Sequence, residues 1–250
     1  MTFDVDALVV AAFLAFCRIG SCFMVMPGLS SVRVPVQIRL FVAVAASFAL
    51  LMHLWDSLLP IADSQPAVLA GLVLSEVATG ALIGLMARIY ILALQFVGAA
   101  MAMMMGYGAL VTPSIEEADA QPPLTNLITF GALLLLFIGN FHHEIIKALV
   151  ASYRIAPPNL LFNPRSALTD VTDTLSESFL VMIQLGSPFI AYGIIVNLIV
   201  GFLNKLTPQI PIYFVSLPFV LAGGLVLVYF GLGGMLRLFA DGFVPITIGR

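Results

Sequence analysis

Long apolar stretches recur along the whole chain, and short segments that hold most of the charges separate them. A membrane-spanning helix needs about 20 consecutive, mostly apolar residues. The stretches that approach or exceed this length are Ala7–Met26, Leu40–Trp55, Val68–Met105, Leu124–Phe141, Phe179–Leu203 and Ile212–Phe239. Because Val68–Met105 is long enough for two crossings, the pattern predicts an all-α, polytopic membrane protein of about six or seven apolar helical segments.

The composition leaves too few charges for a water-facing surface. Hydrophobic residues make up 61% of the 250 residues and charged residues 9%, and the mean hydropathy is +1.12. A soluble domain carries about 25% charged residues, so we expect residues 1–250 to form one membrane-embedded domain without a separate soluble domain. The net charge of −3 and the lack of a basic run exclude nucleic acid as an expected partner.

The basic residues suggest which loops face the cytoplasm, since cytoplasmic loops carry an excess of Lys and Arg. Arg33 and Arg39 place the first loop inside. Arg88, near the middle of Val68–Met105, suits an inside turn between two crossings. On this map the acidic loop that holds Glu116, Glu117 and Asp119 lies outside.

Proline falls inside two of the apolar segments. Pro188 and Pro218 each remove a backbone donor, so we expect them to kink or interrupt their helices. Several helices should therefore be bent or broken.

Three charged residues lie within apolar segments: Arg18, Glu76 and Arg88. A charge near the bilayer centre costs about 2.5–3.5 kcal/mol on insertion scales, so such residues usually face protein or water. They could mark an ion or proton path, or they could be structural. A relay usually shows several carboxylates or histidines in series, which the chain lacks. We therefore expect Arg18 to pair with Glu76, or these charges to face an adjoining subunit.

No catalytic, cofactor-binding or metal-binding residues are expected. In "FHHEIIK", His142, His143 and Glu144 are adjacent, and adjacent helical residues point about 100° apart, so they cannot converge on one tetrahedral ion. A solvated helix end is the better interpretation. No nucleophile elbow, phosphate loop or pair of catalytic carboxylates is present in the sequence.

The run "MAMMMGYGALVTPSIEEADAQPP", Met101–Pro123, combines methionines, glycines and an acidic loop. Methionine deforms around irregular shapes, and glycine permits backbone conformations that a side chain blocks. Irregular backbone at membrane depth is tolerated only inside protein or along a water-filled cavity. The run is either a helix end with an exposed loop or a segment that lines a passage. "MGYG" resembles part of the potassium filter motif, but the threonine is missing and a filter needs four such loops around one axis.

Glycines at Gly80 and Gly84 give a GxxxG spacing in "TGALIG". Small residues at this spacing let helices approach closely in lipid. We expect this face to meet another helix.

The C-terminal run "GFLNKLTPQIPIYFVSLPFVLAGGL", Gly201–Leu225, closely resembles the signature of the FliR family, the export-gate subunit of flagellar and type III secretion. Other stretches agree in the same order. They are "FCRIGSCFMVMPGLSSVRVPVQIRL", "SEVATGALIGLMAR" and "MGYGALVTP". The resemblance therefore covers essentially the whole chain.

The resemblance implies an assembly and a location. FliR-family proteins join FliP-like and FliQ-like subunits in a helical hetero-oligomer in the bacterial inner membrane, at the flagellar basal body. An FlhB-like subunit wraps the cytoplasmic entrance, and unfolded flagellar proteins pass through the gate. Many apolar helices would pack against neighbouring subunits, out of the bilayer plane.

The resemblance also implies roles for particular residues. The loop after Met103 would contribute to a plug that closes the pore at rest, without catalysis and without a cofactor. The expected plug residues are Met103, Met104, Met105, Gly106, Tyr107, Gly108 and Pro113. The expected signature packing residues are Asn204, Lys205, Pro208, Gln209 and Pro218. The alternatives are a stand-alone secondary transporter, which would need a midplane site usually built between repeated halves, and an intramembrane enzyme.

Overall fold

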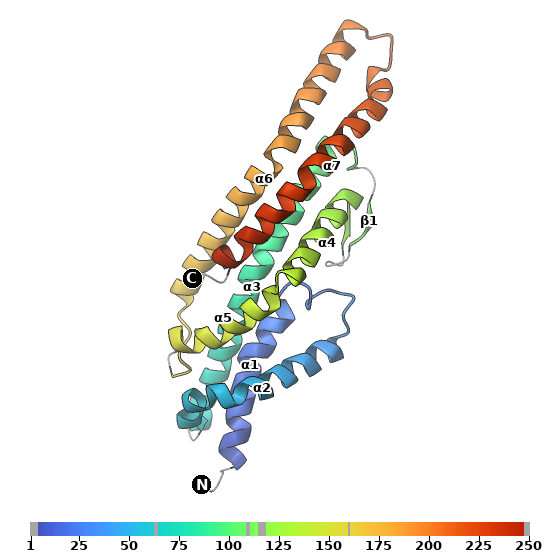
Figure 1. Cartoon of the computed structure of the whole chain (residues 1–250). Coiled ribbons are helices and arrows are strands. Elements are labelled where there is room, and N and C mark those ends of the chain that lie inside the picture. Colours follow the sequence, from blue (N-terminus) through green and yellow to red (C-terminus); the bar gives the residue numbers. More distant parts are fainter. Residues whose placement is uncertain (1–4, 63–64, 109–110, 115–118, 160, 248–250) are drawn as a thin grey trace. The chain divides into compact units, whose positions relative to one another are not determined.

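A computed structural model of the chain describes residues 5–62, 65–108, 111–114, 119–159 and 161–247 (Figure 1). The described part is almost entirely helical. Its elements are α1 (Val5–Val25), α2 (Val36–Ala62), α3 (Pro66–Met104), β1 (Thr112–Pro113), β2 (Ala120–Gln121), α4 (Pro123–Ile138), α5 (Phe141–Ile155), α6 (Pro164–Leu206) and α7 (Ile212–Thr247). The all-α prediction is confirmed.

Five helices, α1, α2, α3, α6 and α7, are long and apolar enough to cross a membrane. The α4–α5 pair forms a sixth such segment, bent by 67° at its break. Asn140, the residue before α5, has a left-handed backbone with φ of 57°, and this conformation cannot continue a helix. The prediction of a polytopic chain with broken helices is therefore confirmed.

The predicted turn at Arg88 is wrong. α3 is one helix of 39 residues, and Arg88 lies inside it, half-buried. Proline is absent after the first residue of α3, and its glycines all precede or follow Arg88 by several residues, so nothing in the local sequence ends the helix there. Val68–Met105 does not form two crossings, and the sidedness predicted for the acidic loop does not follow.

Neither Pro188 nor Pro218 interrupts its helix, and the alternative, that each of them kinks its helix, stays a prediction. α6 runs on through Pro188 and α7 runs on through Pro218. Pro188 cannot donate to the carbonyl of Gln184, but the Ser187 hydroxyl donates to that oxygen at 2.8 Å. The serine thus satisfies the acceptor that the proline leaves open, and the helix continues.

The chain divides into two compact units. Unit 1 holds Met1–Ile89, Asn140–Leu175 and Val244–Arg250, and unit 2 holds Tyr90–Gly139 and Ser176–Phe243. α3 and α6 each pass from one unit into the other. The expectation of one membrane-embedded domain stays a prediction.

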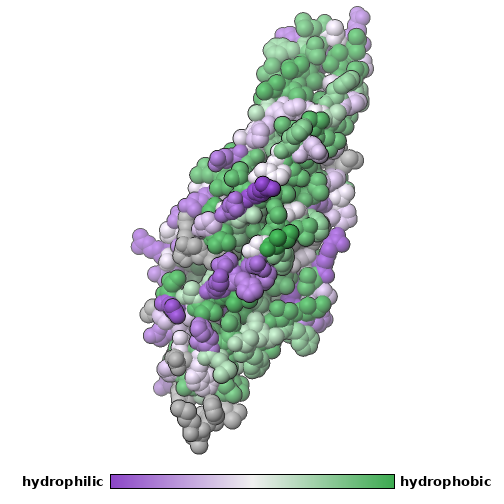
Figure 2. Space-filling view, in the orientation of Figure 1, coloured by the Kyte–Doolittle hydropathy of each residue, from purple (hydrophilic) through white to green (hydrophobic). Residues whose placement is uncertain are grey.

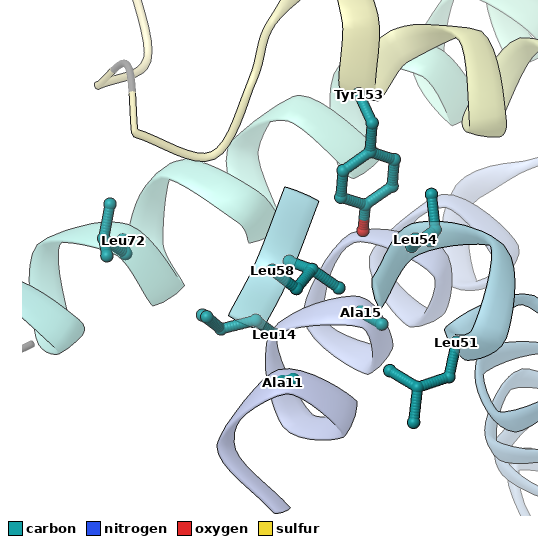
Figure 3. Close-up of a cluster of buried hydrophobic side chains, with 8 residues drawn as sticks. All are labelled: Ala11, Leu14, Ala15, Leu51, Leu54, Leu58, Leu72 and Tyr153. Carbon is teal, nitrogen blue, oxygen red and sulfur yellow. The ribbon is translucent and has the colours of Figure 1, made fainter. Parts of the chain in front are cut away.

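The core of unit 1 gathers leucine and alanine side chains from α1, α2 and α3 around a tyrosine of α5 (Figure 3). Its buried members are Ala11, Leu14, Ala15, Leu51, Leu54, Leu58, Leu72 and Tyr153. Alanine on α1 lets the leucines of α2 approach closely. This cluster is apolar except for the Tyr153 hydroxyl, and it fixes α1 and α2 to each other.

Close helix contact in unit 1 occurs where the sequence predicted it. A methyl group added at Gly80 would collide with the backbone carbonyl of Arg18, and one at Gly84 would lie 2.6 Å from the carbonyl of Cys22. A step of four residues along α3, from Gly80 to Gly84, matches a step of four residues along α1, from Arg18 to Cys22. The two helices therefore run in the same direction here. The predicted GxxxG face of α3 therefore meets α1.

Unit 2 uses glycine in the same way. On α6, Gly186 packs against Val97 of α3, and on α7, Gly231 packs against Phe189 of α6, whose ring would lie 2.9 Å from an added methyl. α6 and α7 lie side by side (Figure 1), and the Tyr192 hydroxyl of α6 donates to the Val220 carbonyl of α7 at 2.8 Å. Glycine thus sets how closely these helices approach.

Gly80→Ala should destabilise the protein, because the added methyl meets fixed backbone of α1 rather than a flexible side chain. Overpacking of this kind costs about 1–3 kcal/mol. Gly71→Ala on the same helix is the matched control, since its methyl would meet only Leu161 at 3.9 Å. Thermal unfolding of the two variants in detergent measures the difference. Equal unfolding midpoints would show that the α1–α3 approach is not tight.

Candidate functional site

A buried ion pair joins α1 to α3 in unit 1. Arg18 Nε donates to Glu76 Oε2, and Arg18 Nη2 donates to Glu76 Oε1, both at 2.7 Å. Each side chain is 1% exposed. This is a bidentate contact, the strongest geometry for an arginine and a carboxylate.

Helix α5 completes the surroundings of the arginine. Arg18 Nη1 donates to Ser152 Oγ at 3.1 Å, and Nη2 donates to the Ala156 carbonyl at 2.9 Å. The guanidinium carbon lies 3.9 Å from the centre of the Tyr153 ring, within the range of a cation–π contact. Four of the five guanidinium hydrogens thus have a partner, and one arginine ties three helices together.

Sequence reasoning placed Arg18 and Glu76 together as one option but missed the residues from α5. Ser152 and Tyr153 are separated from the pair by more than 70 residues in the sequence, and serine and tyrosine in a helix carry no signal of such a contact. Arg88 does not take part in the contacts of Arg18 that are described above. The pair is mutually neutralised and fully enclosed, which suits a structural role better than proton transfer.

A cavity of about 340 Å³ opens beside this cluster in unit 1. Its lining mixes apolar side chains of α3 and α5 with polar groups, among them Arg18, Thr79, Ser152, Asn163 and Asp170. Among the described residues there is no group of three or more His, Cys, Asp and Glu that could hold a metal ion.

The loop that follows α3 begins with a defined helix cap. Gly106 has φ of 85°, its N–H donates to the Met103 carbonyl at 3.2 Å, and the Tyr107 N–H donates to the Ala102 carbonyl at 2.8 Å. These two bonds form a Schellman motif, which favours glycine at the left-handed position. The sequence prediction that Gly106 permits a special backbone conformation is confirmed.

The three methionines before this cap differ in surroundings. Met103 is 71% exposed, Met104 is half-buried and Met105 is 0% exposed. Gly108 folds back onto the first of them, so that a methyl added there would lie 2.9 Å from Met103 Cγ. Met103 is therefore uncovered at the surface of the chain, whereas Met105 is packed within it.

Beyond the cap, β1 and β2 form a short antiparallel ladder in which Thr112 faces Gln121 and Pro113 faces Ala120. Asn126 of α4 donates from Nδ2 to Thr112 Oγ1 at 2.8 Å and to the Pro113 carbonyl at 3.3 Å. This asparagine, which belongs to no motif in the sequence, links the loop to a helix. Glu116 and Glu117 lie outside the described residues, and Asp119 is exposed.

The residues of the C-terminal signature gather around the connection between α6 and α7. Asn204, Lys205, Pro208, Gln209 and Pro218 are all exposed. Large apolar side chains are exposed around them, including Phe202, Leu206, Tyr213, Phe214 and Phe219. The visible surface of the molecule is largely apolar (Figure 2). Within the isolated chain these residues pack against little.

Comparison with known proteins finds similarity over nearly the whole chain. Residues 9–245 match the model of a family described as "Bacterial export proteins, family 1". The chain is 30% identical over 242 residues to the flagellar biosynthetic protein FliR of Caulobacter vibrioides, covering 93% of this chain and 92% of the relative. It is 27% identical over 233 residues to the FliR of Aquifex aeolicus, covering 91% and 87%, and 24% identical over 223 residues to that of Bacillus subtilis, covering 85% and 82%.

Single charge reversals, Arg18→Glu or Glu76→Arg, should strongly lower the amount of folded protein in the membrane. Leaving one buried charge without its partner costs about 3–5 kcal/mol. The double reversal should recover part of this loss, because the pair is restored while the bonds from position 18 to Ser152 and Ala156 are not. Quantitative immunoblotting and thermal unfolding of the three variants test this. A double variant no better than either single variant contradicts a direct energetic pairing.

Proposed function

The chain belongs to family 1 of the bacterial export proteins, the FliR family, and on that premise we propose that it is a subunit of the flagellar protein-export gate. With FliP-like and FliQ-like subunits it would form a channel in the bacterial inner membrane at the flagellar basal body. Unfolded flagellar proteins would pass through this channel, and an FlhB-like subunit would lie at its cytoplasmic entrance. The chain conducts its cargo without chemical turnover, and the energy for export comes from other components.

The observation that carries this proposal is the mismatch between helix length and membrane thickness. α6 has 43 residues and α7 has 36. At about 1.5 Å per residue these helices are about 65 and 54 Å long, whereas the hydrocarbon core of a bilayer is about 30 Å thick. The first residues of α6, up to Ser178, are largely polar, so its apolar part, Phe179–Leu206, is about 42 Å long. This part and the whole of α7 both exceed the thickness of the hydrocarbon core.

Exposed apolar side chains run along the whole apolar part of α6 and along α7. Phe179 and Leu180 near the start of the long apolar part of α6, and Phe202 and Leu206 at its end, are all exposed. Only 11% of the most apolar window of α7 is buried within the chain. Exposed apolar surface of this extent marks a site of protein or membrane contact, and the excess over the bilayer thickness points to partner subunits.

Large, exposed residues around the α6–α7 connection fit the same proposal. Lys205 is the one basic residue in the run Asn204–Pro218. The aromatic residues Tyr213 and Phe214 lie in the same run, and more than half of each is exposed. Aromatic residues are enriched where proteins bind each other. In the assembled gate this connection would pack against neighbouring subunits.

The loop after α3 is the part of the chain that would help to close the pore. It follows an exposed methionine of α3, Met103, and contains two glycines and a short strand pair. A closure for unfolded proteins must admit many side-chain shapes, and methionine adapts to irregular surfaces. Tyr107, Gly108 and Pro113 belong to this loop, and they are the next candidates to contact the cargo.

The Arg18–Glu76 pair has a structural role in this proposal. It holds α1, α3 and α5 together in unit 1, because the carboxylate of Glu76 neutralises the guanidinium of Arg18 while Arg18 also donates to Ser152 and Ala156. It would keep the subunit rigid while the loop of unit 2 moves.

Purification in mild detergent tests the assembly. The tagged chain, co-expressed with its FliP-like and FliQ-like neighbours, should elute as one large hetero-oligomer that contains all three proteins. Size-exclusion chromatography with mass spectrometry of the peak measures this. Elution as a solitary chain that by itself catalyses solute uptake into vesicles would instead indicate a stand-alone transporter.

Deletion of residues 106–121 tests pore closure. Because this segment contains the cap glycine and both strands, its loss should leave the channel permeable to small ions while the subunits still co-purify. A membrane-potential dye in growing cells reports the leak, and the amount of co-purified partner subunits is the control for assembly. An intact ion barrier in a normally assembled deletion variant would refute the closing role.

A further inference from the structure

The base of the closing loop is packed into two notches, each made by a glycine. Gly193 of α6 lies directly against Met104, such that a methyl added at Gly193 would collide with Met104 Cβ and lie 3.2 Å from its Sδ. Gly224 of α7 lies against Met105, whose Sδ would be 2.9 Å from an added methyl. Two consecutive methionines are thus held by two different helices.

The first notch is the last step of a regular contact between α3 and α6. Val97 packs against Gly186, and seven residues later Met104 packs against Gly193. A shift of seven residues on both helices returns to the same face after two turns, so the two helices run parallel with matched register. The α3–α6 contact therefore continues to Met104, the final residue of α3.

The residues that follow α3 remain in contact with α7 as far as Tyr107. The α-carbon of Gly106 faces Leu217 and Leu221, at 3.4 and 3.5 Å from an added methyl. The Tyr107 hydroxyl donates to the Leu221 carbonyl in a long bond of 3.4 Å. Burial, together with nearby Tyr192, raises the pKa of Tyr107.

We propose that Met104 and Met105, seated against Gly193 and Gly224, are the fixed anchor of the closing loop, and that Met103 is the methionine that meets the exported chain. This inference rests on the proposed function, and it assigns the three neighbouring methionines different roles. Gly193 and Gly224 are positioning residues: they act through the methionines and not by contact with the cargo. On this assignment the segment from Met104 to Tyr107 stays in place when the gate opens.

Gly224→Ala tests the anchor, because its methyl would push Met105 out of the notch. Gly234→Ala on the same helix is the matched control, since nothing lies within 4 Å of a methyl at that position. In the purified complex, hydrogen–deuterium exchange of peptides that cover residues 101–108 should become about tenfold faster in Gly224→Ala. The exchange in Gly234→Ala should equal that of the parent.

The same two variants, in cells, are assayed for ion leak with a membrane-potential dye. Gly224→Ala should leak and Gly234→Ala should not, at equal amounts of co-purified subunits. Met105→Ala removes the side chain that fills the notch, so by itself it should speed exchange and cause a leak as Gly224→Ala does. The double variant should be about as strongly affected as either single variant, because both changes remove the same contact. This non-additivity separates loss of the anchor from general unfolding.

Equal exchange in Gly224→Ala and Gly234→Ala overturns the anchor. Faster exchange without a leak also overturns it, provided that deletion of 106–121 does leak, because the anchor would then not hold the closure. If the deletion itself does not leak, the pore-closing function fails, and the exchange comparison alone still decides whether Gly224 fastens this turn.

Discussion

Close approach of helices at glycine is the interaction on which the rest of this structure depends. Packing in lipid gains no hydrophobic free energy, because acyl chains are as apolar as leucine, so helices associate through tight van der Waals contact and polar bonds. In unit 1, Gly80 and Gly84 bring α3 against the backbone of α1, which places Arg18 and Glu76 within hydrogen-bond distance. In unit 2, Gly186 and its counterparts on α7 let methionine, valine and phenylalanine side chains interlock.

This mode of packing has a consequence for the outer surface. A glycine contact covers only a small part of the helix surface. Each helix therefore packs one face against other helices of the same chain, and the apolar side chains on its other faces stay exposed. α7 shows this most clearly, because its side chains Phe219, Tyr229 and Phe230 are each at least 75% exposed. This exposed apolar surface is the feature on which the proposed assembly with other subunits rests, and the chain belongs to an export family.

The sequence was sufficient for the fold class, the family and the face of α3 that meets another helix, because hydropathy, the signature run and GxxxG spacing are local signals. It failed where a distant or subtle group decides the outcome. Arg88 looked like a loop residue, yet nothing near it ends α3. Pro188 looked like a break, yet the Ser187 hydroxyl satisfies the free carbonyl. The contacts of Gly193 with Met104 and of Gly224 with Met105 were not predicted. Each joins two segments that are far apart in the sequence, and the sequence of one helix does not show which residues of another helix lie beside it.

The most direct test of the account is a cryo-electron microscopy map of the chain inside its co-expressed assembly. We expect the exposed side chains of α6 and α7 to contact neighbouring subunits over most of their length, with Met103 facing the central passage and Met105 still seated against Gly224. A map in which lipid surrounds α6 and α7 on all sides, or in which Met103 faces away from any passage, would contradict it.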